Sequence, residues 1–293
     1  MAATPDALAD ATVDRDSIRE RVSETLSRLS RTGALPALPQ AAIAALALAR
    51  DPTADAERLC RLIQTDVGLS ARVLRVANSV AYARRKSTTT LSAAVVTIGL
   101  RKTCDILVAA SARRLYGAAS RQAECLCNHA LAVAIACEEL ARLTRTVDPG
   151  AAFLPGLFHD VGRIAFLLAD RPSFEVIEGL ADAADTPRPA LETEWYGFDH
   201  AQAGGVLAEE WGLAQEQCDG IRWHHEPSQA RLGRDIATLI NAADALVYRL
   251  EPPDARPAPT GIGLAALGLS PEDEAECAAR VQEAFVEQQS ILS

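Results

Sequence analysis

Apolar residues along this chain recur at intervals of three and four, the spacing of one face of an α-helix. Ile18, Val22, Leu26 and Leu29 show the pattern first, and the same period returns as far as about residue 250. Runs with the period of two that marks a half-buried strand are few. The pattern therefore predicts an all-α protein.

Capping and breaking residues divide this pattern into successive helices. Asp55, Asp66, Thr90 and Asp199 each precede an apolar run, and their side chains are of the kinds that cap helix N-termini. Prolines and glycines mark the breaks between helices. The clearest expected helices are 40–50, 91–98, 100–116, 121–143, 200–211, 216–223 and 236–250.

The helices group into two lobes that meet near Gly117. We expect a disordered N-terminus at 1–16, an N-terminal helical lobe at 17–117 and a second helical lobe at 118–250. A linker is expected at 251–270, because four prolines fall within its first ten residues. An acidic helix is expected at 271–293.

Composition narrows the class of protein. With 293 residues, 49% of them hydrophobic, the chain can bury a substantial core, and its net charge of −10 argues against bulk nucleic-acid binding. The apolar stretches considered are too short to cross a bilayer, and the acidic start lacks the features of a signal peptide. Seven cysteines without a C-x-x-C pair suit a reducing cytosol, so a cytoplasmic protein is expected.

Basic side chains are concentrated between residues 71 and 120. This segment holds nine lysines and arginines and one acid, Asp105. A solvated helical face is the simpler interpretation, since a basic run alone is a weak motif. A docking patch for an acidic partner or for phosphates is the alternative.

All five histidines lie between positions 129 and 225, and two aspartates belong with them. Imidazole is the commonest protein metal ligand, and mixed nitrogen and oxygen donors suit a divalent cation: Fe, Mn, Zn or Mg. Neighbours on one helix point about 100° apart, so His159 and Asp160 could serve two sides of one ion. The candidate metal ligands are His129, His159, Asp160, His200, His224, His225 and Asp244.

Three stretches together resemble the HDOD family, a branch of the HD superfamily. They are Leu-Pro-Ala-Leu-Pro at 35–39 with the segments that follow it to residue 100, Gly-Leu-Phe-His-Asp-Val-Gly at 156–162, and the segments from 194 to 225 that end in Ile-Arg-Trp-His-His. The resemblance covers about residues 20–250. It implies an all-helical fold and a regulatory role in bacterial signal transduction, beside two-component or cyclic-di-GMP proteins. Many members of the family have lost the HD-type metal ligands.

The related HD-GYP group hydrolyses cyclic-di-GMP at a metal centre, and this chain departs from its pattern. Pro227-Ser228 stands where the Gly-Tyr-Pro segment would follow, and Arg163 stands where a lysine is usual. Cys125 occupies the position of a glutamate that supplies a third metal site in some members. These departures count against cyclic-di-GMP hydrolysis, although the positions that match the superfamily ligands remain.

The leading hypothesis is a cytoplasmic HDOD signalling protein that acts through protein–protein contacts and carries a metal in its second lobe. A separate signalling protein is its expected partner, and the N-terminal lobe is the expected docking surface. The alternative is a metal-dependent phosphohydrolase for a nucleotide or cyclic dinucleotide, in which Arg163 contacts phosphate. A metal oxygenase is a third, weaker hypothesis.

Overall fold

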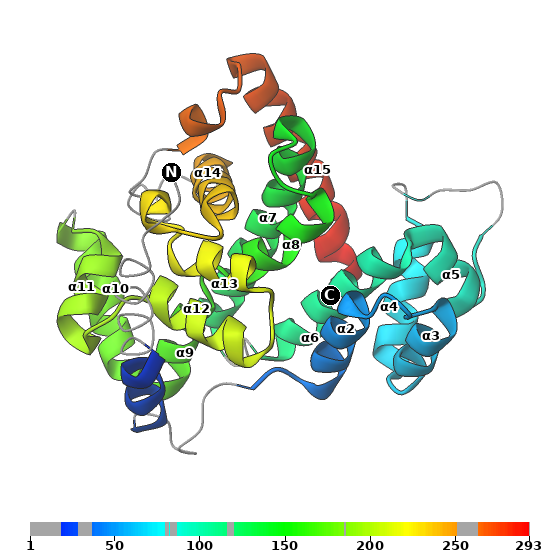
Figure 1. Ribbon diagram of the computed structural model, residues 1–293, viewed down its shortest axis with the longest axis horizontal. Helices are drawn as coiled ribbons and strands as arrows, with labels where there is room; N and C mark the ends of the chain where they lie inside the picture. The colour runs from blue at the N-terminus through cyan, green and yellow to red at the C-terminus, as the bar shows by residue number, and fades with distance from the viewer. Residues whose placement is uncertain are drawn as a thin grey trace, which may run out of the picture.

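The computed structural model describes residues 19–28, 37–79, 82, 87–115, 120–184, 186–250 and 263–292. Every regular element within these residues is a helix, which confirms the all-α prediction. The helices form a smaller group built from the first part of the chain and a larger group built from the second part (Figure 1). Residues 1–16, expected to be disordered, lie outside the described residues.

The smaller group contains five helices, and three of them begin after a predicted cap. The Asp55 carboxylate accepts the Arg58 amide at 2.8 Å, and Asp66 and Thr90 cap the next two helices in the same way. Gly99 ends the fourth helix with a φ of 90°, which favours glycine. The helices are α2 (Gln40–Arg50), α3 (Ala56–Gln64), α4 (Val67–Ala77), α5 (Leu91–Ile98) and α6 (Leu100–Leu115).

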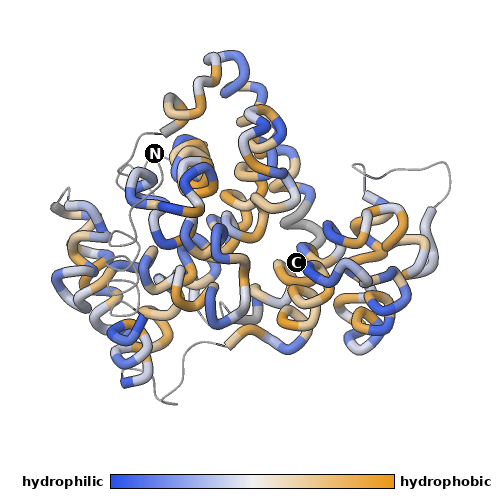
Figure 2. The backbone as a smooth tube through the Cα atoms, in the orientation of Figure 1, coloured by the Kyte–Doolittle hydropathy of each residue, from blue (hydrophilic) through white to orange (hydrophobic). Residues whose placement is uncertain are grey.

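The larger group is arranged around one long central helix. This helix, α7 (Arg121–Thr144), contacts α8, α9, α14 and α15, and nearly all of its length from residue 129 to 141 is buried. The other helices are α8 (Pro149–Phe158), α9 (Val161–Ala169), α10 (Arg171–Ala184), α11 (Arg188–Tyr196), α12 (His200–Glu210), α13 (Gln215–Arg222) and α14 (Arg234–Leu250). Hydrophobic and hydrophilic segments alternate along most helices, as expected for helices packed on a shared core (Figure 2).

One helical stretch of the described chain, Pro149 to Ala169, is both long and apolar. By length and composition alone these 21 residues could cross a membrane, but 89% of the most apolar window is buried inside the protein. The stretch is also interrupted between α8 and α9, where His159 and Asp160 lie. Burial in the core of the larger group therefore accounts for its hydropathy.

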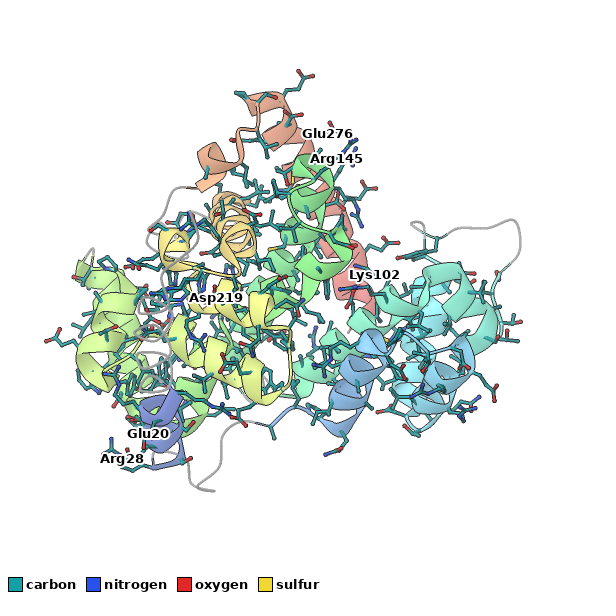
Figure 3. The ribbon with its side chains drawn as sticks, viewed as in Figure 1. Glu20, Arg28, Lys102, Arg145, Asp219 and Glu276 are labelled. Carbon is teal, nitrogen blue, oxygen red and sulfur yellow. The ribbon has the colours of Figure 1, made fainter. Side chains whose placement is uncertain are left out.

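Two basic residues of the 71–120 segment contact the larger group. The Lys102 ammonium pairs with the Glu138 carboxylate of α7 and lies 4.4 Å from the centre of the Phe153 ring. The Arg101 Nε donates to the Gly150 carbonyl at 3.0 Å. Figure 3 shows Lys102 where α6 approaches the larger group. At these two positions the segment joins the lobes instead of forming a free basic surface.

Two segments differ from the expected organisation, and a third forms the helix expected there. Residues 19–28 form a helix that the Arg19–Glu210 ion pair ties to α12, away from α2–α5 (Figure 1). Within the expected linker, the 3-10 helix η3 (Gly263–Leu267) packs against α14 and buries Leu264, while residues 251–262 lie outside the described residues. The expected C-terminal helix is α15 (Pro271–Leu292), which packs on α7 and touches α4. Local periodicity predicts a helix but not the surface on which it packs.

Candidate metal centre

The seven candidate ligands come together at the centre of the larger group. Three lie within helices: His129 in α7, Asp244 in α14 and His200 at the first position of α12. The other four lie at two helix ends: His159 and Asp160 at the α8–α9 junction, and His224 and His225 just after α13. Three overlapping groups of donor atoms each lie within 4.8 Å of one another: His129, His159 and Asp244; His159, Asp160 and His224; His200, His224 and His225. Metal–ligand bonds are about 2.0–2.2 Å long, so donors this close can share an ion.

His159 and Asp160 are not neighbours within one helix, contrary to the sequence interpretation. His159 ends α8, and Asp160 takes the N-cap position of α9 with φ −99° and ψ 12°. The Asp160 carboxylate makes no capping hydrogen bond to the helix that it precedes. The break between the two helices therefore leaves this carboxylate available to the histidines around it.

Two histidines hold an unpartnered nitrogen in the interior. The Nδ1 atoms of His159 and His224 lie 2.8 Å from the carbonyl oxygens of Gly156 and Ile221. A carbonyl only accepts, so each Nδ1 carries the proton and each Nε2 presents a lone pair. Both Nε2 atoms are buried and make no hydrogen bond. Buried lone pairs without a donor are costly, and a metal cation is a partner that fits them.

The Glu192 carboxylate fixes His200 from outside the ligand group. Its Oε2 accepts from the His200 backbone amide at 2.8 Å and from Nδ1 at 2.5 Å. This leaves the His200 Nε2 facing inward, 3.1 Å from Asp160 Oδ1 and 2.8 Å from His225 Nε2. A carboxylate that orients a ligating histidine is a common supporting feature of metal sites.

Protonation states in the cluster suit metal binding. Burial lowers the pKa of His159, and that of His224 to about 3, so both rings are neutral near pH 7. Burial raises the pKa of Asp160, but the neighbouring His159, Arg163 and His200 outweigh it and hold the pKa well below its usual range. The pKa of His200 is lowered by burial but raised to about 10 overall by Glu192 and Asp160. The bound cation would take the place of that proton.

Arg163 holds the outer oxygen of Asp160. Its guanidinium lies 2.9 Å from Asp160 Oδ2 through Nη1 and 2.8 Å from Glu178 Oε2 through Nη2. The side chain is buried, and Glu178 is held in turn by Arg188 at 2.6 Å. These contacts argue against the phosphate contact considered from the sequence. Arg163 instead leaves Asp160 Oδ1 directed at His159 and His200, at 3.5 and 3.1 Å.

Two glycines allow the ligand-bearing segments to approach. A Cβ on Gly162 would lie 2.1 Å from the His200 carbonyl oxygen, and one on Gly156 would lie 2.8 Å from the Ala134 Cα. These distances are far below contact, so only glycine lets α9 meet α12 and α8 meet α7 this closely.

Hydrogen bonds with two polar side chains hold the segment that follows α13. One carboxylate oxygen of Asp219 accepts the backbone amides of Arg231, Leu232 and Gly233 at 2.7–3.0 Å. The buried Asn241 amide donates to the His224 carbonyl at 2.9 Å. Figure 3 shows Asp219 inside the larger group. These residues fix the backbone that presents both histidines.

Sequence reasoning missed the residues that support the ligands: Glu192, Glu178, Asn241 and Asp219. Each is a common residue at no special spacing from the ligand that it holds. The burial of Glu192 and Asp219 is evident only in the folded structure. Asp219 is 6% exposed and Glu192 is 1% exposed.

Comparison with known proteins identifies a family that matches this chain. The model of the HDOD domain matches residues 35–227. An uncharacterised protein of Treponema pallidum (strain Nichols) is 26% identical over 192 residues, which are 65% of this chain and 37% of that protein. The chain thus spans well under half the length of that relative.

Solved structures of similar fold cover almost the whole chain. A candidate phosphohydrolase from Shewanella amazonensis SB2B has a TM-score of 0.74 at 23% identity, covering 93% of this chain and 98% of the other. An HDOD domain protein of unknown function from Geobacter sulfurreducens has a TM-score of 0.74 at 22% identity, covering 94% and 97%. At these identities the likeness concerns the fold. The family match over both lobes of helices, with the histidine cluster in the second, shows that the chain belongs to the HDOD family.

Proposed function

We propose that this chain is an HDOD regulatory protein that binds a divalent metal in its second lobe and acts through contact with a signalling partner. The main support for metal binding is the pair of buried Nε2 atoms on His159 and His224, neither of which has a hydrogen-bond partner. Neither a proton donor nor a hydrogen bond within the described residues uses these lone pairs. A cation that Asp160 also binds would use both lone pairs.

The enclosure of the donor set favours a regulatory over a catalytic role. Five of the seven ligands are buried, and only His225 and Asp244 are partly exposed. Structural metal sites are closed by protein ligands, whereas catalytic sites keep a position open to substrate. A metal here would supply positive charge that holds α7, α9, α12 and α14 together.

Five imidazoles and two carboxylates favour Fe, Mn or Zn over Mg, because Mg²⁺ prefers oxygen ligands and keeps several waters. The remaining expectations rest on the family and on composition. All seven cysteines are free, which suits a reducing cytoplasm. The partner belongs by family to a two-component or cyclic-di-GMP pathway.

A second candidate function is metal-dependent phosphoester hydrolysis. Asp160 favours it, because its Oδ1 lies between His159 and His200 and could join two ions. One solved structure of similar fold, 17% identical with a TM-score of 0.60, is a candidate metal-dependent phosphohydrolase from Shewanella amazonensis SB2B. Bound metals would supply a hydroxide and clamp a phosphoryl group.

One assay separates the two functions. Wild-type protein and the Asp160→Ala variant, each supplied with Mn or Fe, are tested on a panel of nucleotides, cyclic dinucleotides and a generic phosphodiester. The regulatory proposal expects equal background hydrolysis from both proteins, together with a Tm that chelation lowers in wild type alone. Turnover by wild type that Asp160→Ala abolishes would replace the regulatory proposal with the enzymatic one.

A further inference from the structure

A cavity of about 360 Å³ lies where the two lobes meet, apart from the histidine cluster. Helices α2 and α6 form its wall on the first-lobe side. The second-lobe side is formed by α8, the turn between α12 and α13, α13 itself and α14. Sites for small molecules commonly occupy about 300–1,000 Å³ and favour such junctions. The cavity is therefore large enough for a small organic ligand.

Four charged side chains line this cavity: Arg50, Arg101, Asp105 and Glu216. The two arginines and the glutamate are exposed, whereas Asp105 is 2% exposed, which places its carboxyl at the inner end. The Nε atoms of the arginines donate to the carbonyls of Leu46 and Gly150, and the terminal nitrogens of both remain available. Within the described residues, none of the four is in an ion pair, and the Asp105 carboxyl makes no hydrogen bond.

The position of Arg50 is built into the lobe junction. A Cβ on Gly212, in the turn between α12 and α13, would lie 3.1 Å from both terminal nitrogens of Arg50. Gly212 has a φ of 76°, so the turn itself also favours glycine. The guanidinium thus sits against second-lobe backbone while its own helix belongs to the first lobe.

The remaining walls are apolar, including Leu46, Leu154 and Ile236. Two guanidinium groups at the mouth attract an anion, and planar guanidinium suits carboxylate and phosphate geometry. We propose that the cavity binds a small organic anion, whose carboxylate or phosphate pairs with Arg50 and Arg101 and whose hydrogen-bond donor reaches Asp105.

The charge balance supports an anion despite the two acids. Glu216 offsets one arginine, which leaves the mouth with a net positive charge. Burial raises the pKa of Asp105 to about 7, against the lowering effect of Lys102 and with a smaller contribution from Glu138. Near neutral pH the inner carboxyl is therefore only partly charged. It repels an anion far less than an ordinary aspartate would.

A ligand here would contact the helices that carry the metal ligands. Leu154 lies on α8, which ends at His159, and Ile236 lies on α14, which carries Asp244. The opposite wall, with Asp105, belongs to the first lobe. Binding would therefore stabilise the observed arrangement of the two lobes. The inference does not depend on whether the histidine cluster is loaded.

The test uses the full chain with two anionic probes, benzoate and phenyl phosphate, and neutral benzyl alcohol as a shape control. Calorimetry and thermal unfolding are measured for wild type, Arg50→Gln, Arg101→Gln and the matched variant Arg61→Gln. Arg61 is an exposed α3 arginine that does not line the cavity. Because Arg50 and Arg101 are exposed, both variants are expected to fold, and their Tm without probe verifies this.

The expected result is millimolar or tighter binding of at least one anion, with a rise in Tm. Affinity should fall about tenfold or more in Arg50→Gln and in Arg101→Gln, because each removes a charge-assisted hydrogen bond, and should be unchanged in Arg61→Gln. Preference for one probe identifies the anionic group as carboxylate or phosphate. Failure of both anions to bind, equal binding of benzyl alcohol, or affinities that neither cavity variant changes would each overturn the proposal.

Discussion

Glu192 holds His200 through two hydrogen bonds to a single carboxylate oxygen, one from the backbone amide at 2.8 Å and one from Nδ1 at 2.5 Å. Both side chains are buried, at 1% and 2% exposed. The pair fixes the ring so that Nε2 points at Asp160. A residue outside the ligand group therefore decides where one ligand points.

Replacing Glu192 with glutamine should weaken metal binding while leaving the ligands in place. An amide is a poorer acceptor for Nδ1–H, so His200 loses basicity and orientation. We expect affinity for Zn²⁺ or Mn²⁺ to fall about 10–100-fold in a metal titration. Glu194→Gln, an exposed position on the same helix, is the control and should bind as wild type does. Equal affinities for Glu192→Gln and wild type would remove the supporting role assigned to Glu192.

The two glycines Gly162 and Gly179 should respond in opposite ways to alanine. At Gly162 the new Cβ would lie 2.1 Å from the His200 carbonyl, whereas at Gly179 nothing lies within 4 Å. Gly162→Ala should therefore destabilise by about 1–3 kcal/mol or more and weaken metal binding, since α9 and α12 must separate. Gly179→Ala should raise the free energy of unfolding by up to about 1 kcal/mol, because alanine has the higher helix propensity. Urea unfolding measures both, and a neutral Gly162→Ala would contradict the close approach.

Much of this fold could be predicted from sequence, because its signals are local. Asp55, Asp66 and Thr90 cap the helices that they were expected to cap. The histidines were expected to converge, and they do so. Packing partners were not predictable. Nothing in the periodicity of residues 19–28 places that helix beside Glu210, and nothing near Glu192 shows that it meets His200.

His224 should matter more than His225 to metal affinity, although the sequence makes both candidate ligands. His224 is fully buried, has an unpartnered Nε2 and belongs to two of the three donor groups. His225 is partly exposed and belongs to one. Glutamine replaces each ring without adding charge. In a metal titration, His224→Gln should lose more affinity than His225→Gln, and the reverse order would contradict this assignment.

Asp105 should make stability fall as pH rises through neutrality. Burial raises its pKa in the folded protein from 3.8 to about 7, so the folded state holds its proton more tightly than the unfolded state. The stabilisation that comes from this tighter proton binding is therefore fully present below about pH 4 and is lost as the pH rises through 7. Each pKa unit corresponds to about 1.4 kcal/mol.

Unfolding free energies of wild type and Asp105→Asn at pH 5 and pH 8 measure this effect. The wild type should lose more stability between the two values, by a few kcal/mol at most. Asp51→Asn is the control. Hydrogen bonds from Thr53 and then Arg58 lower the pKa of Asp51 to about 2, so it stays ionised throughout this range. If wild type and Asp105→Asn show the same pH dependence, Asp105 is not a buried titrating acid.

The most direct test of the account is the metal content of the full chain, purified without chelators and without a histidine tag. The account predicts that wild type carries Fe, Mn or Zn in near-stoichiometric amount, that Asp160→Ala and His159→Ala carry little, and that chelation lowers the Tm of wild type alone. Protein that contains no metal when prepared anaerobically, and that takes up none when Fe, Mn or Zn is added, would contradict the metal centre.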